Sequence, residues 1–107
     1  MSKTLKKIQT LAETSDVLIS EHGYDELSND GLTARETVEG VKHAVLIEDY
    51  PDYPKGPAVL VLQKNSSGNP VHAVWGIPKG HNRPAVLVTA YCPDPQRWNN
   101  TFTERKR

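Results

Sequence analysis

The 107-residue sequence is poor in the features that mark exported, membrane-bound or disulfide-bonded proteins. Its single cysteine, Cys92, forms neither an intramolecular disulfide nor a zinc site on its own. No stretch approaches the roughly 18 consecutive apolar residues of a membrane-spanning helix, and the lysine-rich start lacks the apolar segment of a signal peptide. We therefore expect a cytoplasmic protein that has no membrane partner.

Motifs of metal, nucleotide and nucleophile sites are also missing. The four histidines show no short metal-binding spacing such as His-x-x-x-His. A glycine-rich phosphate loop is absent, because Gly76-x3-Gly80 lies in a predicted hairpin and is followed by His81, where such a loop has Lys and then Ser or Thr. A Gly-x-Ser-x-Gly nucleophile motif is absent too. The sequence thus predicts no bound metal and no cofactor.

The remaining composition is typical of one small domain over residues 1–107, with 36% hydrophobic and 24% charged residues. The formal net charge is zero, yet the charges are segregated. Residues 1–54 carry five basic and eleven acidic side chains, a balance of −6, whereas residues 55–107 carry eight basic and two acidic ones, a balance of +6. The two halves either complement each other within the fold or leave a local basic surface for a partner.

Apolar spacing and capping residues predict two or three helices in the N-terminal part. Apolar residues recur at helical spacing over residues 3–14. Ser20 is suited to cap a second helix, and Thr33 and Glu36 have the spacing of a capping box that starts a third. The short apolar run 17–19 fits a strand or a helix equally well.

Four β-favouring stretches follow, joined by turn-rich connections that contain no helix. They cover residues 44–47, 58–64, 71–77 and 85–92. Strands that follow one another through short turns are typically antiparallel. The sequence therefore predicts an α+β fold, in which two or three N-terminal helices pack on a three- to four-stranded antiparallel β-meander.

Residue alternation sorts the strands into two faces if the hairpin turns are centred. One face is predicted to carry Ala58, Leu60, Leu62, Val71, Ala73, Trp75, Ile77, Ala85, Leu87, Thr89 and Tyr91. The other is predicted to carry Val59, Val61, Gln63, His72, Val74, Val86, Val88 and Ala90. Because both faces are mostly apolar, the sheet is either covered on both sides or uses one face for a partner. Since few helices are available to cover it, we expect one face to bind a protein partner or a second copy.

A basic loop follows Trp75, in a stretch that has no acidic residue from position 65 to position 93. It contains Lys79, His81 and Arg83, which are candidate phosphate- or RNA-binding residues, since cations beside an aromatic ring can hold phosphates while an unpaired base stacks. The alternative is an ordinary solvated hairpin loop.

Four short motifs occur in a fixed order along the chain. They are Ser20-Glu21-His22, Glu48-Asp49-Tyr50-Pro51, Gly68-Asn69-Pro70-Val71-His72-Ala73-Val74 and Val88-Thr89-Ala90-Tyr91-Cys92-Pro93-Asp94. In this order they resemble the small bacterial proteins of domain-of-unknown-function family 4258. The resemblance covers residues 17–98 and leaves a helix over residues 1–16 and a basic, frayed tail over residues 99–107. Many members carry arginine where this chain has Glu26 and Asp30.

The resemblance implies a layout similar to that of ribonuclease toxins from toxin–antitoxin pairs, and it leaves two hypotheses. In a metal-independent ribonuclease, His72 and His22 would act as acid and base, while Tyr91, Lys79 and Arg83 would position or neutralise the scissile phosphate. In the hypothesis that we favour, the histidines are structural, and the chain is a protein-interaction module or a homodimer that uses its surplus apolar sheet face.

Overall fold

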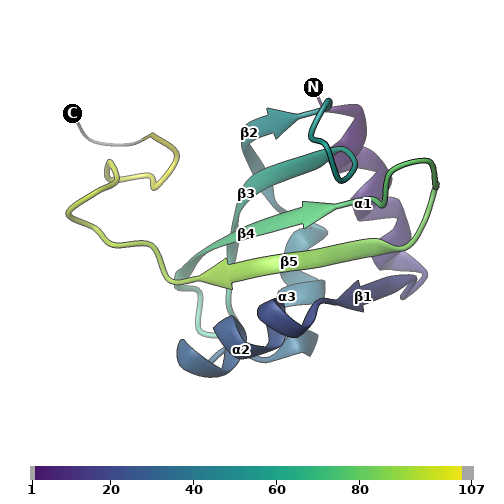
Figure 1. Ribbon diagram of the computed structural model, residues 1–107. Helices are drawn as coiled ribbons and strands as arrows, with labels where there is room; N and C mark the ends of the chain where they lie inside the picture. The colour runs from purple at the N-terminus through teal and green to yellow at the C-terminus, as the bar shows by residue number, and fades with distance from the viewer. Residues whose placement is uncertain (1, 105–107) are drawn as a thin grey trace.

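The computed structural model describes residues 2–104, which form three helices and one five-stranded sheet (Figure 1). The elements are α1 (Lys3–Glu13), β1 (Val17–Ile19), α2 (Glu21–Asn29), α3 (Ala34–Val41), β2 (Val45–Tyr50), β3 (Ala58–Lys64), β4 (Pro70–Gly76) and β5 (Ala85–Tyr91). The α+β class and the three helices confirm the sequence prediction. No helix in the described part of the chain is long and apolar enough to cross a membrane.

Each helix begins at a side chain that satisfies a free backbone N–H of its first turn. Ser2 accepts a hydrogen bond from the backbone of the first turn of α1, and Ser20 does the same for α2. At α3, Thr33 and Glu36 form the reciprocal capping box, in which each side chain accepts from the other residue's backbone N–H. The predicted caps of α2 and α3 are thereby confirmed.

The sheet is mixed, with the strand order β1-β5-β4-β3-β2. Strands β2 to β5 form the expected antiparallel meander, but β1 joins its edge in parallel to β5. The prediction of a purely antiparallel sheet of three or four strands is therefore wrong. The prediction failed because β1 has only three residues and pairs with residues 85–87, which are far away in the sequence. The hydrophobic pattern of three residues does not indicate a pairing of this kind.

The register of β3 also corrects the predicted faces. Val59 pairs with Trp75 and Leu62 pairs with His72, because the β3–β4 hairpin turns through residues 65–69. Relative to β4, each β3 side chain therefore lies on the face opposite to the predicted one. The reason is that a shift of one residue in the pairing moves every side chain of a strand to the other face.

A bulge between β4 and β5 changes the faces again. It lies at Val74 and Trp75, and beyond it Ala90 pairs with Ala73, while Tyr91 pairs with His72. An extra residue in one strand reverses the alternation from that point onward. Ala90 therefore lies on the same face as Trp75, and Tyr91 lies on the opposite face, whereas the prediction placed them the other way round.

The hydrophobic core lies between the helices and the sheet face that carries Trp75, here called the inner face. In Figure 1, α1 and α3 lie behind the sheet, and α2 runs beside β5. The fully buried side chains of this core include Ile8, Val41, Val59, Val61, Trp75 and Leu87. Two polar side chains in this core are paired: Trp75 Nε1 donates to Gln63 Oε1 at 3.2 Å, and Gln63 Nε2 donates to the carbonyl of Thr37 at 2.7 Å.

The opposite, outer face carries His72 and is partly covered by the chain's own C-terminal segment. This segment, residues 93–104, is here called the C-terminal strap. Trp98 of the strap is buried with 6% of its surface exposed, and its ring packs against His72. The final residues of the predicted basic tail, 105–107, lie outside the described residues.

Candidate functional site on the outer sheet face

Two of the predicted catalytic residues lie together on the outer face, beneath the C-terminal strap. His72 and Tyr91 are cross-strand partners, and their ring centroids are 5.6 Å apart. The Trp98 ring contacts His72 edge-on, with centroids 4.2 Å apart. His72 Nε2 donates to the carbonyl oxygen of Phe102 at 2.7 Å, since a carbonyl can only accept. With 0% of its surface exposed, His72 is enclosed by aromatic rings and the strap.

The third predicted catalytic residue, His22, lies elsewhere. It is exposed on the first turn of α2, where its Nε2 lies 3.7 Å from Glu26 Oε1. Within residues 2–104, no hydrogen bond, ion pair or ring contact joins His22 to His72 or Tyr91. The structure thus brings together two of the three predicted catalytic side chains.

The predicted phosphate-binding residues lie in the loop after β4, whereas His72 is near the beginning of that strand. At about 3.3 Å per residue, the strand alone separates His72 from this loop by roughly 13 Å. Arg83 forms a bidentate ion pair with Asp16, at 2.6 and 2.8 Å. Lys79 and His81 are exposed. The loop therefore offers two exposed basic side chains at a distance from His72, while Arg83 is paired within the fold.

The other end of the outer face contains an apolar groove of about 540 Å³, here called the outer groove. It is lined by Tyr50, Tyr53, Lys55, Gly56, Ala58, Val74, Gly76, Ile77, Pro78, Val86 and Val88. The lining combines aliphatic side chains with two tyrosines and one lysine, a composition typical of sites that bind apolar groups while excluding water.

Strand pairing explains the shape of this groove. Tyr50, Ala58, Gly76, Val86 and Leu18 pair in succession, so that they form one row across all five strands. Ala58 and Gly76, the two smallest residues, lie in the middle of the row, and larger residues lie on either side of them. Small central residues therefore make the floor, and Tyr50 and Val86 make the walls.

Sequence reasoning missed the outer groove because its detection requires the correct register of β3 and the bulge between β4 and β5. A weak signal was available in the small residues Ala58 and Gly76, which lie next to Pro57 and near Pro78 at the strand ends. A Cβ atom on Gly76 would lie 3.3 Å from the carbonyl oxygen of Pro57, which is a tight contact. The backbone there leaves little space for a larger residue.

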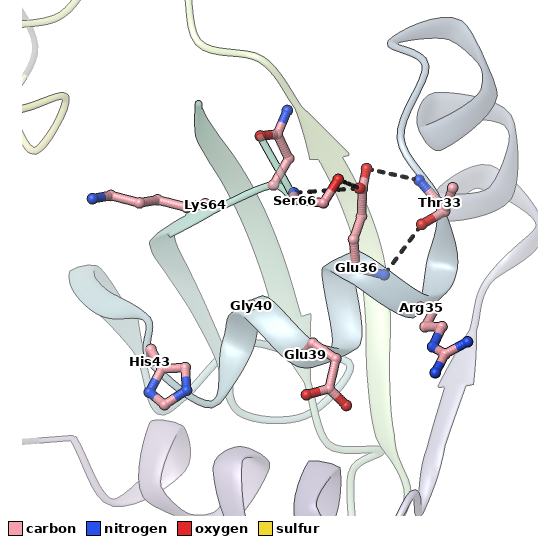
Figure 2. A pocket seen from close by; sticks show the side chains of 9 residues that line it. Thr33, Arg35, Glu36, Glu39, Gly40, His43, Lys64 and Ser66 are labelled. Atoms are coloured by element: carbon pink, nitrogen blue, oxygen red, sulfur yellow. Dashed lines mark hydrogen bonds between the residues drawn. The ribbon is translucent and has the colours of Figure 1, made fainter. Parts of the chain in front are cut away.

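A second pocket, of about 590 Å³, lies between α3 and the β3–β4 hairpin and has a structural explanation (Figure 2). Figure 2 shows Glu36 pointing to Thr33 and Ser66, with the Ser66 hydroxyl donating to its carboxylate at 2.7 Å. This hydrogen bond, together with that from the Thr33 backbone, holds the pKa of Glu36 below its ordinary value of 4.5. The polar groups of the pocket attach the hairpin to α3, which leaves the outer groove as the better candidate for a ligand.

The sequence pattern of the family described as Domain of unknown function (DUF4258) matches residues 19–92. The chain belongs to this family. The resemblance seen in the four sequence motifs is confirmed at that level. The DUF4258 match runs from the end of β1 to the end of β5, so it contains every residue that lines the outer groove, whereas α1 and the C-terminal strap lie outside it. No curated protein and no solved structure matches the chain.

Proposed function

We propose that this DUF4258 protein is a protein-interaction module that binds a segment of a partner protein in the outer groove. The observation that carries the proposal is the apolar groove on the sheet face opposite α1 and α3. The exposed fractions are 52% for Tyr53 and 39% for Val88. Aromatic side chains beside aliphatic ones on an exposed face are typical of the centres of protein interfaces.

The C-terminal strap supports this proposal because it lies on the same sheet face. Its Trp98 packs against His72, and its Phe102 carbonyl accepts a hydrogen bond from that histidine. A segment with an aromatic anchor can therefore pack on the outer face. The outer groove extends beside this occupied area, where the described chain leaves tyrosine and valine side chains exposed.

Site-specific photo-crosslinking tests the proposal. A photoreactive benzoylphenylalanine replaces Val88 in one strain and Tyr24, which is exposed on α2, in the other. We expect position 88 to give a cross-linked product with another protein, and position 24 to give no product of that mass. The captured protein is then purified and titrated against the wild-type chain and against Val88→Lys, which places a charge in the groove. We expect at least a tenfold loss of affinity, about 1.4 kcal/mol.

Two results would contradict the proposal. A product with twice the mass of the 11.9 kDa chain would assign the groove to a homodimer. Equal affinity of the wild-type chain and Val88→Lys would place the partner elsewhere on the surface, provided that both proteins have the same urea midpoint.

A further inference from the structure

We infer that the C-terminal strap competes with the partner segment, because its Trp98 occupies a site on the outer face that a tryptophan of the incoming partner takes in its place. This site is formed by His72 and Tyr91 and is here called the aromatic site. The inference rests on the proposed function and specifies both an anchor of the partner and the way in which the chain restrains binding. It follows from the contacts of the strap, from its internal structure, and from the position of the aromatic site beside the outer groove.

The aromatic site binds a ring and a carbonyl group. The Trp98 ring stands at 87° to the His72 ring, with centroids 4.2 Å apart, and the Phe102 carbonyl oxygen accepts from His72 Nε2 at 2.7 Å. Edge-to-face packing favours a large aromatic side chain, and the imidazole N–H favours an acceptor such as a backbone carbonyl. The seated strap therefore shows which chemistry the site recognises: a tryptophan followed by a turn that presents a carbonyl group.

The strap contains a loop that its own residues hold in shape. Asn99 Oδ1 accepts hydrogen bonds from the N–H groups of Thr103 and Glu104 at 3.0 and 3.3 Å, and the Asn99 N–H donates to the carbonyl of Glu104 at 2.9 Å. Phe102 has a φ of +59°, a left-handed conformation that residues other than glycine rarely adopt. Because these contacts are local, the loop is preformed and attaches to the sheet as a unit through Trp98 and Phe102.

The strap leaves space where it meets the sheet. A pocket of about 450 Å³ lies between the strap and the end of β5, and it is lined by Tyr91, Cys92, Asp94, Arg97 and Trp98. In Figure 1, the yellow strap leaves the end of β5 and projects beyond the end of the sheet. The DUF4258 match ends at residue 92, so it contains both residues of the aromatic site and excludes the strap. The family domain thus supplies the site, whereas a segment beyond it supplies the occupant.

The aromatic site adjoins the outer groove. His72 and Val74 lie on the same face of β4, two residues and about 7 Å apart along the strand, and Val74 lines the groove. A segment bound in the groove therefore reaches the aromatic site with its neighbouring residues, where the closed strap blocks it. Because only the chain with an open strap binds such a segment fully, closure lowers the apparent affinity for the partner in proportion to the open fraction.

A fluorescein-labelled peptide with the sequence of residues 93–104 tests the aromatic site on the full-length chain. Two variants open the site in different ways: Asn99→Ala removes the acceptor that holds the loop, and Trp98→Ala removes the resident ring. Asn100→Ala is the matched control, since Asn100 is exposed in the same loop. Fluorescence anisotropy should show the peptide binding both opened variants at least fivefold more tightly than the wild type, with Asn100→Ala within twofold of the wild type.

Paired changes locate the recognition to the ring and to the imidazole. Trp98→Ala in the peptide should weaken its binding to the Asn99→Ala chain at least tenfold, whereas Arg97→Ala in the peptide should stay within twofold, because 84% of the Arg97 side chain is exposed. His72→Phe in the Asn99→Ala chain keeps a ring and loses the N–H donor, so it should weaken the peptide about fivefold. The exposed His43→Phe is its control.

The partner captured by cross-linking at position 88 tests the competition itself. It should bind Asn99→Ala about fivefold more tightly than the wild type, because the open fraction is larger. The unlabelled peptide of residues 93–104 should displace it from the Asn99→Ala chain, since both need the aromatic site.

The outcomes separate this inference from the proposed function. The inference is overturned if the peptide binds neither opened variant more tightly than the wild type, although at least one of them unfolds cooperatively in urea. A dimer of Asn99→Ala, at twice the 11.9 kDa mass in light scattering, also overturns it and assigns the site to the strap of a second copy. If the partner binds Asn99→Ala and the wild type equally but is weakened by Val88→Lys, the inference fails and the proposed function stands. If Val88→Lys leaves the affinity unchanged, both fail.

Discussion

The ion pair of Asp16 and Arg83 connects the acidic, helical half of the chain to the basic, β-rich half. Arg83 Nε and Nη2 donate to the two carboxylate oxygens of Asp16 at 2.6 and 2.8 Å. These hydrogen bonds hold the pKa of Asp16 below its ordinary value of 3.8. Because the pKa is lower in the folded than in the unfolded protein, the pair stabilises the fold above pH 3.8, and this contribution is lost as the pH falls through the lowered value.

Replacing Arg83 by Gln should therefore raise the pKa of Asp16 towards 3.8, measured by NMR titration of its side-chain carboxyl carbon. Urea unfolding should show the variant less stable than the wild type at about pH 6, with the difference lost as the pH falls through the lowered pKa of Asp16. Arg97→Gln is the matched control, since Arg97 is highly exposed and its Nε lies 3.9 Å from Asp94. An unchanged titration of Asp16 in Arg83→Gln would contradict the structural account of this pair.

Single residues differ in how far the sequence reveals their roles. The capping functions of Ser20, Thr33 and Glu36 were predictable because each depends on neighbours three residues away. His72 was recognisable as a lone polar residue among valines, but its enclosure by Trp98 was not, since this contact depends on the path of the strap. Local interactions are encoded in a short window of sequence, whereas burial depends on the whole fold.

Helix α2 protects the exposed edge of β5, and this contact belongs to the scale of whole elements. Strand β1 pairs with residues 85–87, and α2 continues along the same edge. The Leu87 carbonyl accepts from the Ser20 N–H at 3.1 Å, and the Cys92 N–H donates to Asp30 at the end of α2 at 2.7 Å. Such coverage satisfies edge groups that would otherwise be available to pair with another chain.

Gly23 sets how closely α2 approaches β5. An added Cβ would lie 2.8 Å from the backbone carbonyl oxygen of Leu87. In an open helix, Gly→Ala stabilises by about 0.5–1 kcal/mol, because alanine has the higher helix propensity. Here we expect Gly23→Ala to destabilise by about 1–2 kcal/mol, since two backbones must separate. The sign of the change in urea midpoint is the test, with the exposed Asp25→Ala as control, and a stabilised Gly23→Ala would mean that the contact is looser than described.

At the scale of elements, composition and period were sufficient to locate the helices and the strands of the meander. Composition and period did not predict the edge strand β1, and they did not predict which side chains lie on which face of the sheet. The face on which Tyr91 lies depends on a bulge at Val74 and Trp75, and that of Leu62 depends on the length of one hairpin loop. Since one inserted residue reverses all later side chains, the outer groove could not be derived from alternation alone.

For the molecule as a whole, the segregated charges are partly complementary within the fold. The Asp16–Arg83 pair joins the two halves of the chain, as do the hydrogen bonds from Ser66 to Glu36 and from Lys7 to Asn82. The predicted basic surface is correspondingly reduced at Arg83, while Lys55 and Lys79 remain exposed beside the outer groove. The charge balance of each half was visible in the sequence, but the choice of internal partners was not.

The ribonuclease hypothesis makes a claim about the whole molecule in the cell. A general acid or base must come within about 2.6–3.2 Å of the RNA group that it serves. His72 has no exposed surface, and its Nε2 already donates to the carbonyl of Phe102. Lys79 lies beyond the other end of β4. We therefore expect bacteria that express the wild-type chain to grow normally and to keep intact RNA, as judged by growth curves and gel analysis of total RNA.

Two variants make this expectation decisive, with immunoblots to match expression levels. His72→Ala removes the proposed acid or base, and Trp98→Ala removes the ring that covers it. Growth arrest with RNA cleavage in the wild type, relieved by His72→Ala, would establish the enzyme hypothesis and overturn our expectation. Arrest confined to Trp98→Ala, and relieved when His72→Ala is added, would identify the strap as a cover over a latent active site. Intact RNA in all strains is the expected result, because His72 is enclosed in the wild type and, even without the Trp98 ring, lies far from the exposed lysines that would hold an RNA phosphate.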